Sequence, residues 1–302
     1  MPSPADDLIT IRDLVRYAVS RFNAAGLSFG HGTSSALDDA VFLVLETLKL
    51  PIDELDPWLD ARLTCAERET IVGLIERRVD ERIPTPYLVG RAYIQGIPFH
   101  VDERVIVPRS FIGELLVSSL VGGEGFALID DPEAVTSVVD ICTGSGCLAI
   151  LASRLFPNAE VDAVDLSPDA LEVAAINVET LGADTVHLHQ GDLFGPLAGR
   201  RYDLIVTNPP YVEAEVMAEL PEEYRHEPEM ALAGGHDGLD VVRRILAAAP
   251  DHIAPGGGLI CEIGTGREIL EAEYPDLPFL WLDTEESEAE VFWLTAEALG
   301  VA

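Results

Sequence analysis

Val138-Val139-Asp140-Ile141-Cys142-Thr143-Gly144-Ser145-Gly146 joins an apolar run to a glycine-containing turn, and a helical stretch follows from Leu148. Apolar runs of this length that end in glycine are typical of buried strands. In open α/β sheets, ligands bind at the carboxyl ends of such strands, near the point where the strand order reverses. The segment therefore predicts a strand and a helix of an α/β sheet, with a ligand site at the turn between them.

The alternation of strands and helices continues from this segment toward the end of the chain. Helical stretches are expected at Leu148–Leu155, Pro168–Leu181 and Leu239–Ala249. Strands are expected at Ser137–Ile141, Glu160–Val164, Thr185–His189, Asp203–Thr207, Gly258–Ile263, Pro278–Leu282 and Glu290–Thr295. The rhythm implies a mostly parallel sheet covered on both faces. Because the last two strands are too close for a helical crossover, they should pair antiparallel. The predicted fold is a Rossmann-like, seven-stranded α/β sheet whose last strand is antiparallel.

The residues before the sheet predict a separate helical unit. Apolar residues repeat at helical spacing over Leu8–Phe22 and Ala36–Leu48, and a third helix begins at Thr64, with Glu67 as its capping-box partner. The Ile83–Pro86 segment breaks the pattern, and Tyr93–Val107 suggests a β-hairpin around Gly96. We therefore expect a helical domain at residues 1–90, a β-hairpin linker at 91–107 and the α/β domain at 108–302.

Charge is the unusual feature of the composition. The 302 residues include 53 Asp and Glu against 19 Lys and Arg, a formal net charge of −34, and the only lysine is Lys49. Such a surface repels phosphate backbones, so no direct binding of nucleic acid is expected, and it would attract a basic polypeptide. It would equally suit a salty cytoplasm, and the two explanations are compatible.

Cellular location and metal content are predicted from what the sequence lacks. No apolar run approaches the roughly 20 residues that cross a bilayer, and the first residues do not resemble a signal peptide. We expect a cytoplasmic protein that does not bind a membrane. Cys65, Cys142, Cys147 and Cys261 are scattered, without the second pair or histidine cluster of a zinc site, so no metal is expected.

Acidic residues at the next strand ends extend the predicted ligand site. Asp165 can accept hydrogen bonds from both hydroxyls of a ribose, and Asp192 from an adenine amino group. Either residue alone could be a helix cap or a solvated turn. Together with Asp140 they mark three successive strand ends. Ala149 replaces the third glycine of the dinucleotide fingerprint, which slightly favours a nucleoside ligand such as S-adenosylmethionine.

Asn208-Pro209-Pro210-Tyr211 ends the fourth strand and is the most specific short motif in the chain. An amino group on a conjugated carbon is a poor nucleophile because its lone pair is delocalised. The side-chain oxygen of Asn208 and the carbonyl of Pro209 can each accept one of its two N–H bonds, aim the lone pair at a methyl group and favour pyramidal nitrogen. Tyr211 can pack on the planar group. The alternative is an ordinary β-turn.

At these residues the chain resembles the Asn-Pro-Pro-Tyr methyltransferases, which act on planar amino groups of adenine, guanine or glutamine. It looks most similar to the bacterial protein glutamine methyltransferases, which are class I methyltransferases with an N-terminal helical bundle and a hairpin link. Two departures from the release-factor branch, Val107-Pro108-Arg109-Ser110 and Cys142-Thr143-Gly144-Ser145-Gly146, look like the branch that methylates the third protein of the large (50S) ribosomal subunit. So do the stretches Gly30–Thr33, Phe99–Val105 and Glu223–Glu229.

The resemblance implies an S-adenosylmethionine-dependent N(5)-methylation of a glutamine in a basic ribosomal protein, with the helical domain recognising the substrate. It carries family roles over by position. The acceptor glutamine would be held by Asn208, Pro209, Pro210 and Tyr211. The cofactor would be held by Asp140, Cys142, Thr143, Gly144, Ser145, Gly146, Asp165, Asp192, Leu193 and Asn208. The alternatives are glutamine methylation of a release factor and, further off, methylation of a nucleic-acid amino group.

Two further interpretations concern residues outside these motifs. His31 could suggest a general base, but a capped turn between helices of the bundle is the preferred interpretation. An acidic stretch follows the Asn-Pro-Pro-Tyr motif and is expected to border the substrate entrance, where it could steer a basic protein. Its residues are Glu213, Glu215, Glu219, Glu222, Glu223, Glu227 and Glu229.

Overall fold

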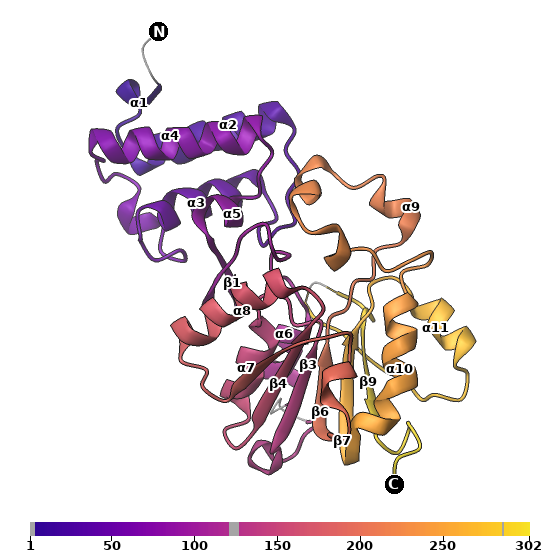
Figure 1. Cartoon of the computed structure of the whole chain (residues 1–302). Helices are drawn as coiled ribbons and strands as arrows, with labels where there is room; N and C mark the ends of the chain where they lie inside the picture. Colours follow the sequence, from indigo (N-terminus) through magenta and orange to yellow (C-terminus); the bar gives the residue numbers. More distant parts are fainter. Residues whose placement is uncertain (1–3, 121–126, 286) are drawn as a thin grey trace.

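The computed structural model describes residues 4–120, 127–285 and 287–302. Its N-terminal helices form a small bundle that lies at one end of the molecule (Figure 1). The bundle consists of α1 (Pro4–Asp7), α2 (Ile11–Ala25), α3 (Ala36–Thr47), η1 (Asp56–Trp58), α4 (Cys65–Asp80) and α5 (Thr85–Val89). Apolar faces of α2, α3 and α4 pack on one another in a shared core.

Local capping decides where the bundle's helices begin. The predicted capping box of Thr64 and Glu67 is confirmed at the start of α4. Thr10 and Asp13 form a second box at α2, so this helix starts at Ile11 rather than at Leu8 as the apolar stripe suggested. The predicted break at Pro84 separates α4 from the short helix α5, which carries Pro86 in its first turn, where a missing N–H costs little.

A β-hairpin joins the bundle to the sheet, as predicted, but it is shorter than expected. Strand β1 (Arg91–Ile94) pairs antiparallel with β2 (Ile97–His100). The strand pairing ends at His100, and the chain continues without regular structure through Val105 and Val107, whose side chains pack against helix α8 (Pro168–Leu181). These buried valines gave the sequence a strand-like appearance beyond the hairpin.

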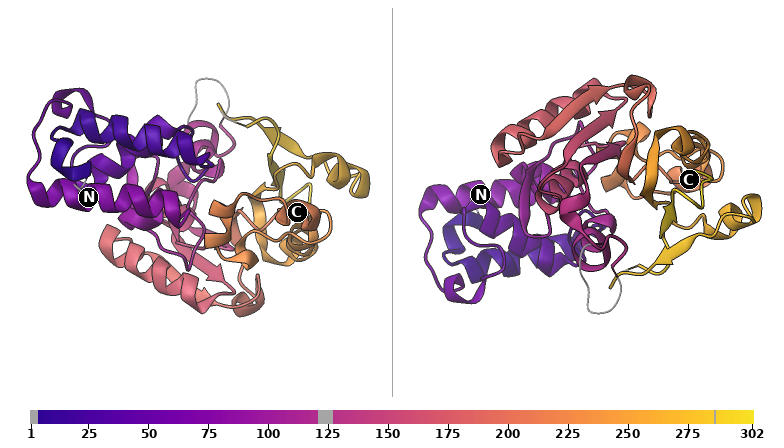
Figure 2. Two further views of the ribbon diagram at one scale, coloured as in Figure 1. Left: turned by 90° about the horizontal axis from the view of Figure 1, so that it is seen from above. Right: turned by 90° about the horizontal axis from the view of Figure 1, so that it is seen from below.

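The sheet has the predicted topology, with strand order β5-β4-β3-β6-β7-β9-β8. Its strands are β3 (Ser137–Ile141), β4 (Glu160–Asp165), β5 (Val186–Gln190), β6 (Tyr202–Thr207), β7 (Ile253–Glu262), β8 (Leu280–Leu282) and β9 (Val291–Thr295). All of them are parallel except β9, which lies antiparallel between β7 and β8. The predicted seven-stranded fold is therefore confirmed. The bundle and the last strands lie at opposite sides of the molecule in both views of Figure 2.

Helices cover both faces of the sheet because successive strand residues point to opposite sides. On one face, Val138 of β3 packs with α6 (Ile112–Leu115), η2 (Leu116–Leu120) and α7 (Cys147–Leu155). On the other face, Val139 packs with α10 (Asp240–His252) and α11 (Arg267–Glu273). Short elements complete the chain: η3 (Pro132–Ala134), η4 (Gly195–Leu197), α9 (Ala214–Met217), η5 (Glu222–His226) and η6 (Glu229–Ala231).

The strand order reverses at β3, which has β4 on one side and β6 on the other. In open α/β sheets this is where ligands bind. None of the helices in the described ranges combines the length and the apolar character that crossing a bilayer requires.

Candidate active site

The turn after β3 is shaped by left-handed backbone. Gly144 and Gly146 have φ of +54° and +79°, and a Cβ on Gly146 would lie 3.2 Å from the Cβ of Ala174 in α8. Cys142 also has a positive φ, of 63°, which costs a residue with a side chain about 1–2 kcal/mol. The turn thereby brings the backbone of Gly144 to the wall of a cavity of about 290 Å³ at the carboxyl edge of the sheet.

Asp140 supports the turn from beneath. Its Oδ2 accepts hydrogen bonds from the Thr143 hydroxyl at 2.5 Å and from the Ala149 amide at 3.1 Å. Its other oxygen is buried, and no group in the described part of the chain donates to it. Burial raises the pKa of Asp140 to about 7. Asp140, Thr143, Ser145 and Gly146 are not among the residues that line the cavity, so their contribution is to hold the turn in place.

Asp165 is fixed by the backbone around it. Its two oxygens accept from the amides of Gly144 and Ser167, each at 2.8 Å. Burial raises the pKa of Asp165 above its ordinary value. Ser167 caps α8 and Pro168 opens it, as the sequence predicted. Asp165 lines the cavity, and two of its roughly four lone-pair sites are left for a ligand.

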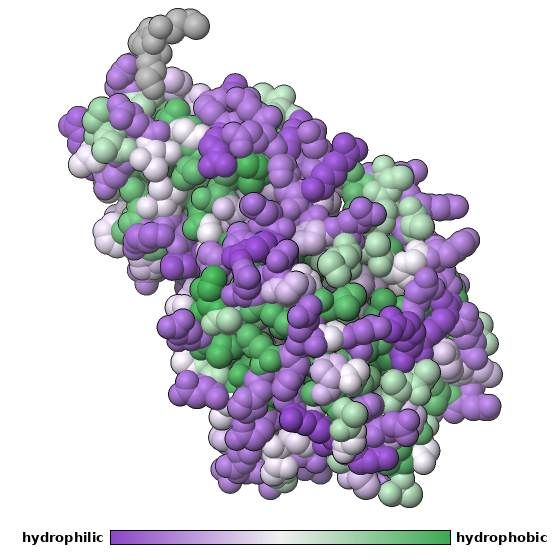
Figure 3. Space-filling model, viewed as in Figure 1, coloured by the Kyte–Doolittle hydropathy of each residue, from purple (hydrophilic) through white to green (hydrophobic). Residues whose placement is uncertain are grey.

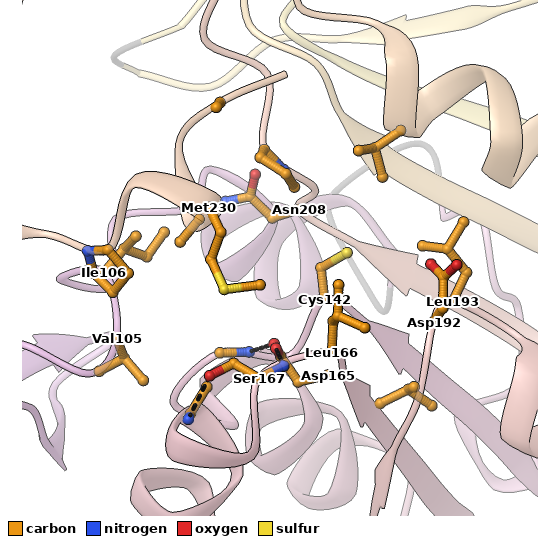
Figure 4. Close-up of a pocket in the computed structure, with 18 of the residues that line it drawn as sticks. Val105, Ile106, Cys142, Asp165, Leu166, Ser167, Asp192, Leu193, Asn208 and Met230 are labelled. Atoms are coloured by element: carbon orange, nitrogen blue, oxygen red, sulfur yellow. Dashed lines mark hydrogen bonds between the residues drawn. The ribbon is translucent and has the colours of Figure 1, made fainter. Parts of the chain in front are cut away.

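Asp192 and Leu193 line the same cavity beyond the end of β5. Arg244 of α10 binds one carboxylate oxygen of Asp192 at 2.6 Å and was not predicted from the sequence. Figure 4 shows the cavity from inside, with Met230 and Asn208 on one side, Asp165 on the other and Cys142 between them. Met230 of η6, Ile106 and Leu166 were also missed, since no motif marks these apolar residues.

Asn208-Pro209-Pro210-Tyr211 follows β6, next to the turn after β3. Asn208 and Pro210 line the first cavity and also a second one, of about 210 Å³. Pro209 and Tyr211 line only the second cavity, which we call the acceptor cavity. Its other residues are Ile106, Arg109, Val212, Leu220, Tyr224, Ala231 and Leu232. The two cavities therefore adjoin and share four lining residues: Ile106, Asn208, Pro210 and Ala231.

Tyr211 is held in place by a buried carboxylate. Its hydroxyl donates to Glu262 at 3.0 Å, and Glu262 also accepts from the Ser110 hydroxyl at 2.7 Å and the Phe111 amide at 3.0 Å. The ring packs so closely on Gly264 that a Cβ there would lie 2.8 Å from it. Burial and the nearby Glu262 raise the pKa of Tyr211 above its ordinary value.

Two glutamates of the acidic stretch are buried, which corrects the expectation that the whole stretch steers substrate. Glu223 is 1% exposed and binds Arg82 at 3.1 Å and the Ser28 amide at 3.0 Å. Glu227 is 5% exposed and holds Arg109 with both oxygens, at 2.6 and 2.8 Å. The neighbouring His31 and the ion pair with Arg109 outweigh burial and lower the pKa of Glu227 to about 2. Both carboxylates join elements of the fold, and neither faces solvent.

The described residues contain no group of three or more His, Cys, Asp and Glu side chains placed to hold a metal ion. The sheet order, the turn after β3 and the paired cavities at the carboxyl edge of the sheet define a Rossmann-like, class I methyltransferase. Residues 127–223 match the family model described as the methyltransferase small domain. A crystal structure of a methyltransferase from Pyrococcus furiosus is similar with a TM-score of 0.48 and 15% identity, covering 77% of this chain and 99% of that chain.

Much nearer relatives span the whole chain. A protein of Bradyrhizobium diazoefficiens is 60% identical over 97% of this chain and 92% of its own length. Proteins of Bordetella pertussis and Neisseria gonorrhoeae are 56% and 54% identical, covering 97% and 98% of this chain and 97% of each relative. Each is named ribosomal protein uL3 glutamine methyltransferase. The chain belongs to this family, which confirms the resemblance found in the sequence.

Proposed function

We propose that this protein transfers a methyl group from S-adenosylmethionine to the side-chain amide nitrogen of a glutamine in ribosomal protein uL3. The observation that carries the proposal is that the two cavities adjoin and share part of their lining. Asn208 lines both of them. A nitrogen held in the acceptor cavity against Asn208 would thus face the end of the other cavity, where the methyl donor binds.

S-adenosylmethionine, the cofactor of this class, supplies an electrophilic methyl group on sulfur. The residues around the first cavity fit such a ligand. Asp165 has acceptor capacity left for the ribose hydroxyls, and Asp192 can accept from the adenine amino group while Arg244 holds its other oxygen. Gly144 and Cys142 bring the turn to the ligand, while Asp140, Thr143, Ser145 and Gly146 keep the turn in shape.

In the acceptor cavity the protein's task is to position a weak nucleophile. The side-chain oxygen of Asn208 and the carbonyl of Pro209 accept the two N–H bonds of the glutamine amide, so its lone pair points toward the first cavity. The same two oxygens stabilise positive charge as it develops on the nitrogen. Tyr211, fixed by Glu262, packs on the planar amide. The N–CH3 bond would form as the S–CH3 bond breaks, giving S-adenosylhomocysteine. No base is needed beforehand, because the nitrogen becomes acidic once it is methylated and then loses one proton to solvent.

The three parts of the chain have different proposed roles. We assign substrate recognition to residues 1–90, the link to residues 91–107 and methyl transfer to residues 108–302. The buried ion pairs of Glu223 with Arg82 and Arg78 support this division, because they fix the bundle beside the acceptor side of the site. A substrate protein bound to both parts would be held over the acceptor cavity.

The negative charge of this protein favours a basic substrate. We place the enzyme in the cytoplasm. Hydrophilic side chains cover most of the face shown in Figure 3, and the chain carries a formal charge of −34. Four glutamates of the acidic stretch remain exposed: Glu215, Glu219, Glu222 and Glu229. They follow the acceptor motif closely in the chain and would raise the encounter rate with a basic ribosomal protein. The same charge disfavours nucleic acid as a substrate.

The test is a direct choice between acceptors. The enzyme is incubated with cofactor that carries a tritiated methyl group, together with free uL3, a release factor or ribosomal RNA. We expect label in uL3, on a glutamine identified by mass spectrometry. Label in the release factor or the RNA with none in uL3 would overturn the proposed substrate.

A further inference from the structure

The turn between α2 and α3 contacts the acceptor side of the site, although it lies in the bundle. His31 is 3% exposed, and its ring lies 4.3 Å from the ring of Tyr224. Gly30 has a φ of +142°, and a Cβ on it would lie 2.6 Å from the hydroxyl of Tyr224. A larger residue at position 30 would have to displace that hydroxyl. The turn therefore contacts Tyr224 at two points. His31 lies against the Tyr224 ring, and Gly30 lies next to the Tyr224 hydroxyl.

The same turn is also connected to Arg109, through Glu227. His31 Nε2 lies 3.6 Å from Glu227 Oε2, and Glu227 binds the guanidinium of Arg109 with both oxygens. Glu227 also accepts from the amide of Val107 at 2.9 Å, which fixes the segment that leads to Arg109. The guanidinium in turn lies 5.5 Å from the centre of the Tyr224 ring. Tyr224 and Arg109 are thus held as one unit, backed by His31.

Tyr224 and Arg109 both line the acceptor cavity, together with Asn208 and Tyr211. Tyr211 is fixed from the sheet by Glu262, whereas Tyr224 is fixed from the bundle by Gly30 and His31. Part of the cavity wall is therefore set by a turn far from the methyltransferase motifs in the sequence. These contacts give Gly30 and His31 a structural role that requires no catalytic role for His31.

We propose that Gly30 and His31 are positioning residues for the acceptor glutamine, acting through Tyr224 and Arg109. The inference rests on the proposed function, in that the ligand of the acceptor cavity is a glutamine side chain of a protein. The bundle would then do more than bind the substrate protein, because its own turn sets the width of the cavity into which the glutamine enters. A displaced wall changes the shape of the cavity that must accept the glutamine side chain, which weakens binding of the acceptor and raises KM.

Two glycines of the same turn provide a matched pair of variants. Gly30→Ala adds a methyl group against the Tyr224 hydroxyl, whereas Gly32→Ala adds one where nothing lies within 4 Å. Both positions have positive φ, of +142° and +83°, so both variants carry backbone strain. We expect Gly30→Ala to lower kcat/KM for uL3 about tenfold or more, mainly through KM, and Gly32→Ala to keep the wild-type KM. S-adenosylhomocysteine should bind both with wild-type affinity.

A double variant distinguishes the steric clash with Tyr224 from the backbone strain at residue 30. Tyr224→Phe removes the atom that the new methyl group meets, so Gly30→Ala/Tyr224→Phe should recover the KM of Tyr224→Phe alone. Hydrogen exchange of residues 222–229 provides a measurement that needs no substrate: it should rise in Gly30→Ala and stay low in Gly32→Ala. His31→Ala, which removes the ring behind Tyr224, should raise KM in the same way and decides the matter if Gly30→Ala does not fold.

Equal KM values for Gly30→Ala and Gly32→Ala, or no recovery in the double variant, would overturn the inference. Wild-type kinetics in His31→Ala would do the same. These outcomes differ from a failure of the proposed function, in which the wild-type enzyme itself puts no label into uL3. In that case the same variants are compared on whichever acceptor the wild type labels.

Discussion

Tyr211 donates its hydroxyl to Glu262 across 3.0 Å, and this bond ties the last residue of the Asn-Pro-Pro-Tyr motif to the end of β7. Glu262 is 1% exposed and has two further donors, Ser110 and Phe111. Removing one donor from a buried carboxylate costs about 1–3 kcal/mol. We expect Tyr211→Phe to lower the free energy of unfolding by about that amount in urea titrations and to raise KM for the acceptor.

Glu262→Gln is the companion variant, because its side-chain oxygen can still accept from Ser110 and the Phe111 amide while its NH2 group donates to the Tyr211 hydroxyl. Burial raises the pKa of Glu262, so replacing it by a neutral amide should cost less stability than losing the tyrosine hydroxyl. Suppose that Tyr211→Phe unfolds at the same urea concentration as the wild type and has the same KM. The hydrogen bond to Glu262 would then not position the tyrosine.

Asn208→Ala tests the clamp on the acceptor nitrogen. The variant keeps the turn after β3 and Asp165, so S-adenosylhomocysteine should bind nearly as in the wild type by calorimetry. Transfer to uL3 should fall about 10²–10³-fold, because one acceptor of the amide N–H bonds is lost where charge develops. Full turnover would refute the role given to Asn208.

Asp165→Ala tests the ribose end of the first cavity. The carboxylate is expected to accept from the ribose hydroxyls, and hydrogen bonds to charged groups contribute about 1.5–3 kcal/mol each. S-adenosylhomocysteine should therefore bind at least about tenfold more weakly. Asp169→Ala, an exposed position in the first turn of α8, is the matched control and should keep its affinity. Equal affinities for the two variants would remove Asp165 from the cofactor site.

Charge steering predicts a salt-dependent effect on capture of the substrate. Changing Glu215, Glu219, Glu222 and Glu229 together to glutamine should lower kcat/KM for uL3 at low salt and leave cofactor affinity unchanged. A control with the same charge change uses Glu133, Asp184, Asp251 and Glu297, exposed residues at the amino edge of the sheet, away from the site. Steering is dismissed if both quadruple variants capture uL3 equally at low salt.

Asp140 should make the stability of the fold depend on pH, in a direction that follows from the burial of its carboxyl group. Burial raises its pKa from 3.8 to about 7, so the folded state binds this proton more tightly than the unfolded chain does. Its contribution to stability is therefore present below pH 3.8 and is lost as the pH rises toward about 7. Asp140→Asn has no carboxyl group to ionise, so its melting temperature relative to that of the wild type should rise as the pH increases from about 4 to about 7. A constant difference across this range would show that Asp140 does not titrate there.

Sequence predicted the sheet well where the signals are local. Helix α8 begins at Pro168 as expected because Ser167 caps it, and β3 matches because its apolar run is bounded by a glycine turn. Strand β7 was predicted from Gly258 but begins at Ile253, because its first part pairs across a register shift with Tyr202 of β6. Nothing in the Pro255-Gly256-Gly257 segment indicates a strand.

The candidate site was predictable to the extent that topology determines it. Asp165, Asp192 and Asn208 end parallel strands, so the sheet brings them to one edge wherever their side chains finally point. Arg109 and Arg244 were not predictable, because each finds its carboxylate across a long stretch of sequence. Glu223 and Glu227 were taken for surface charges because a paired, buried glutamate and a solvated one look identical in a sequence.

The lining that the two cavities share, at Asn208 and Pro210, also suggests how the enzyme could be inhibited. Two adjoining cavities that share these lining residues can be filled by one small molecule that joins an adenosine to a glutamine-like amide through a short linker. Binding of its second half then becomes intramolecular, so the joined compound should inhibit far more strongly than its two halves supplied separately. Enzymes that share the adenosine cavity but have a differently shaped acceptor side would be spared by such an inhibitor.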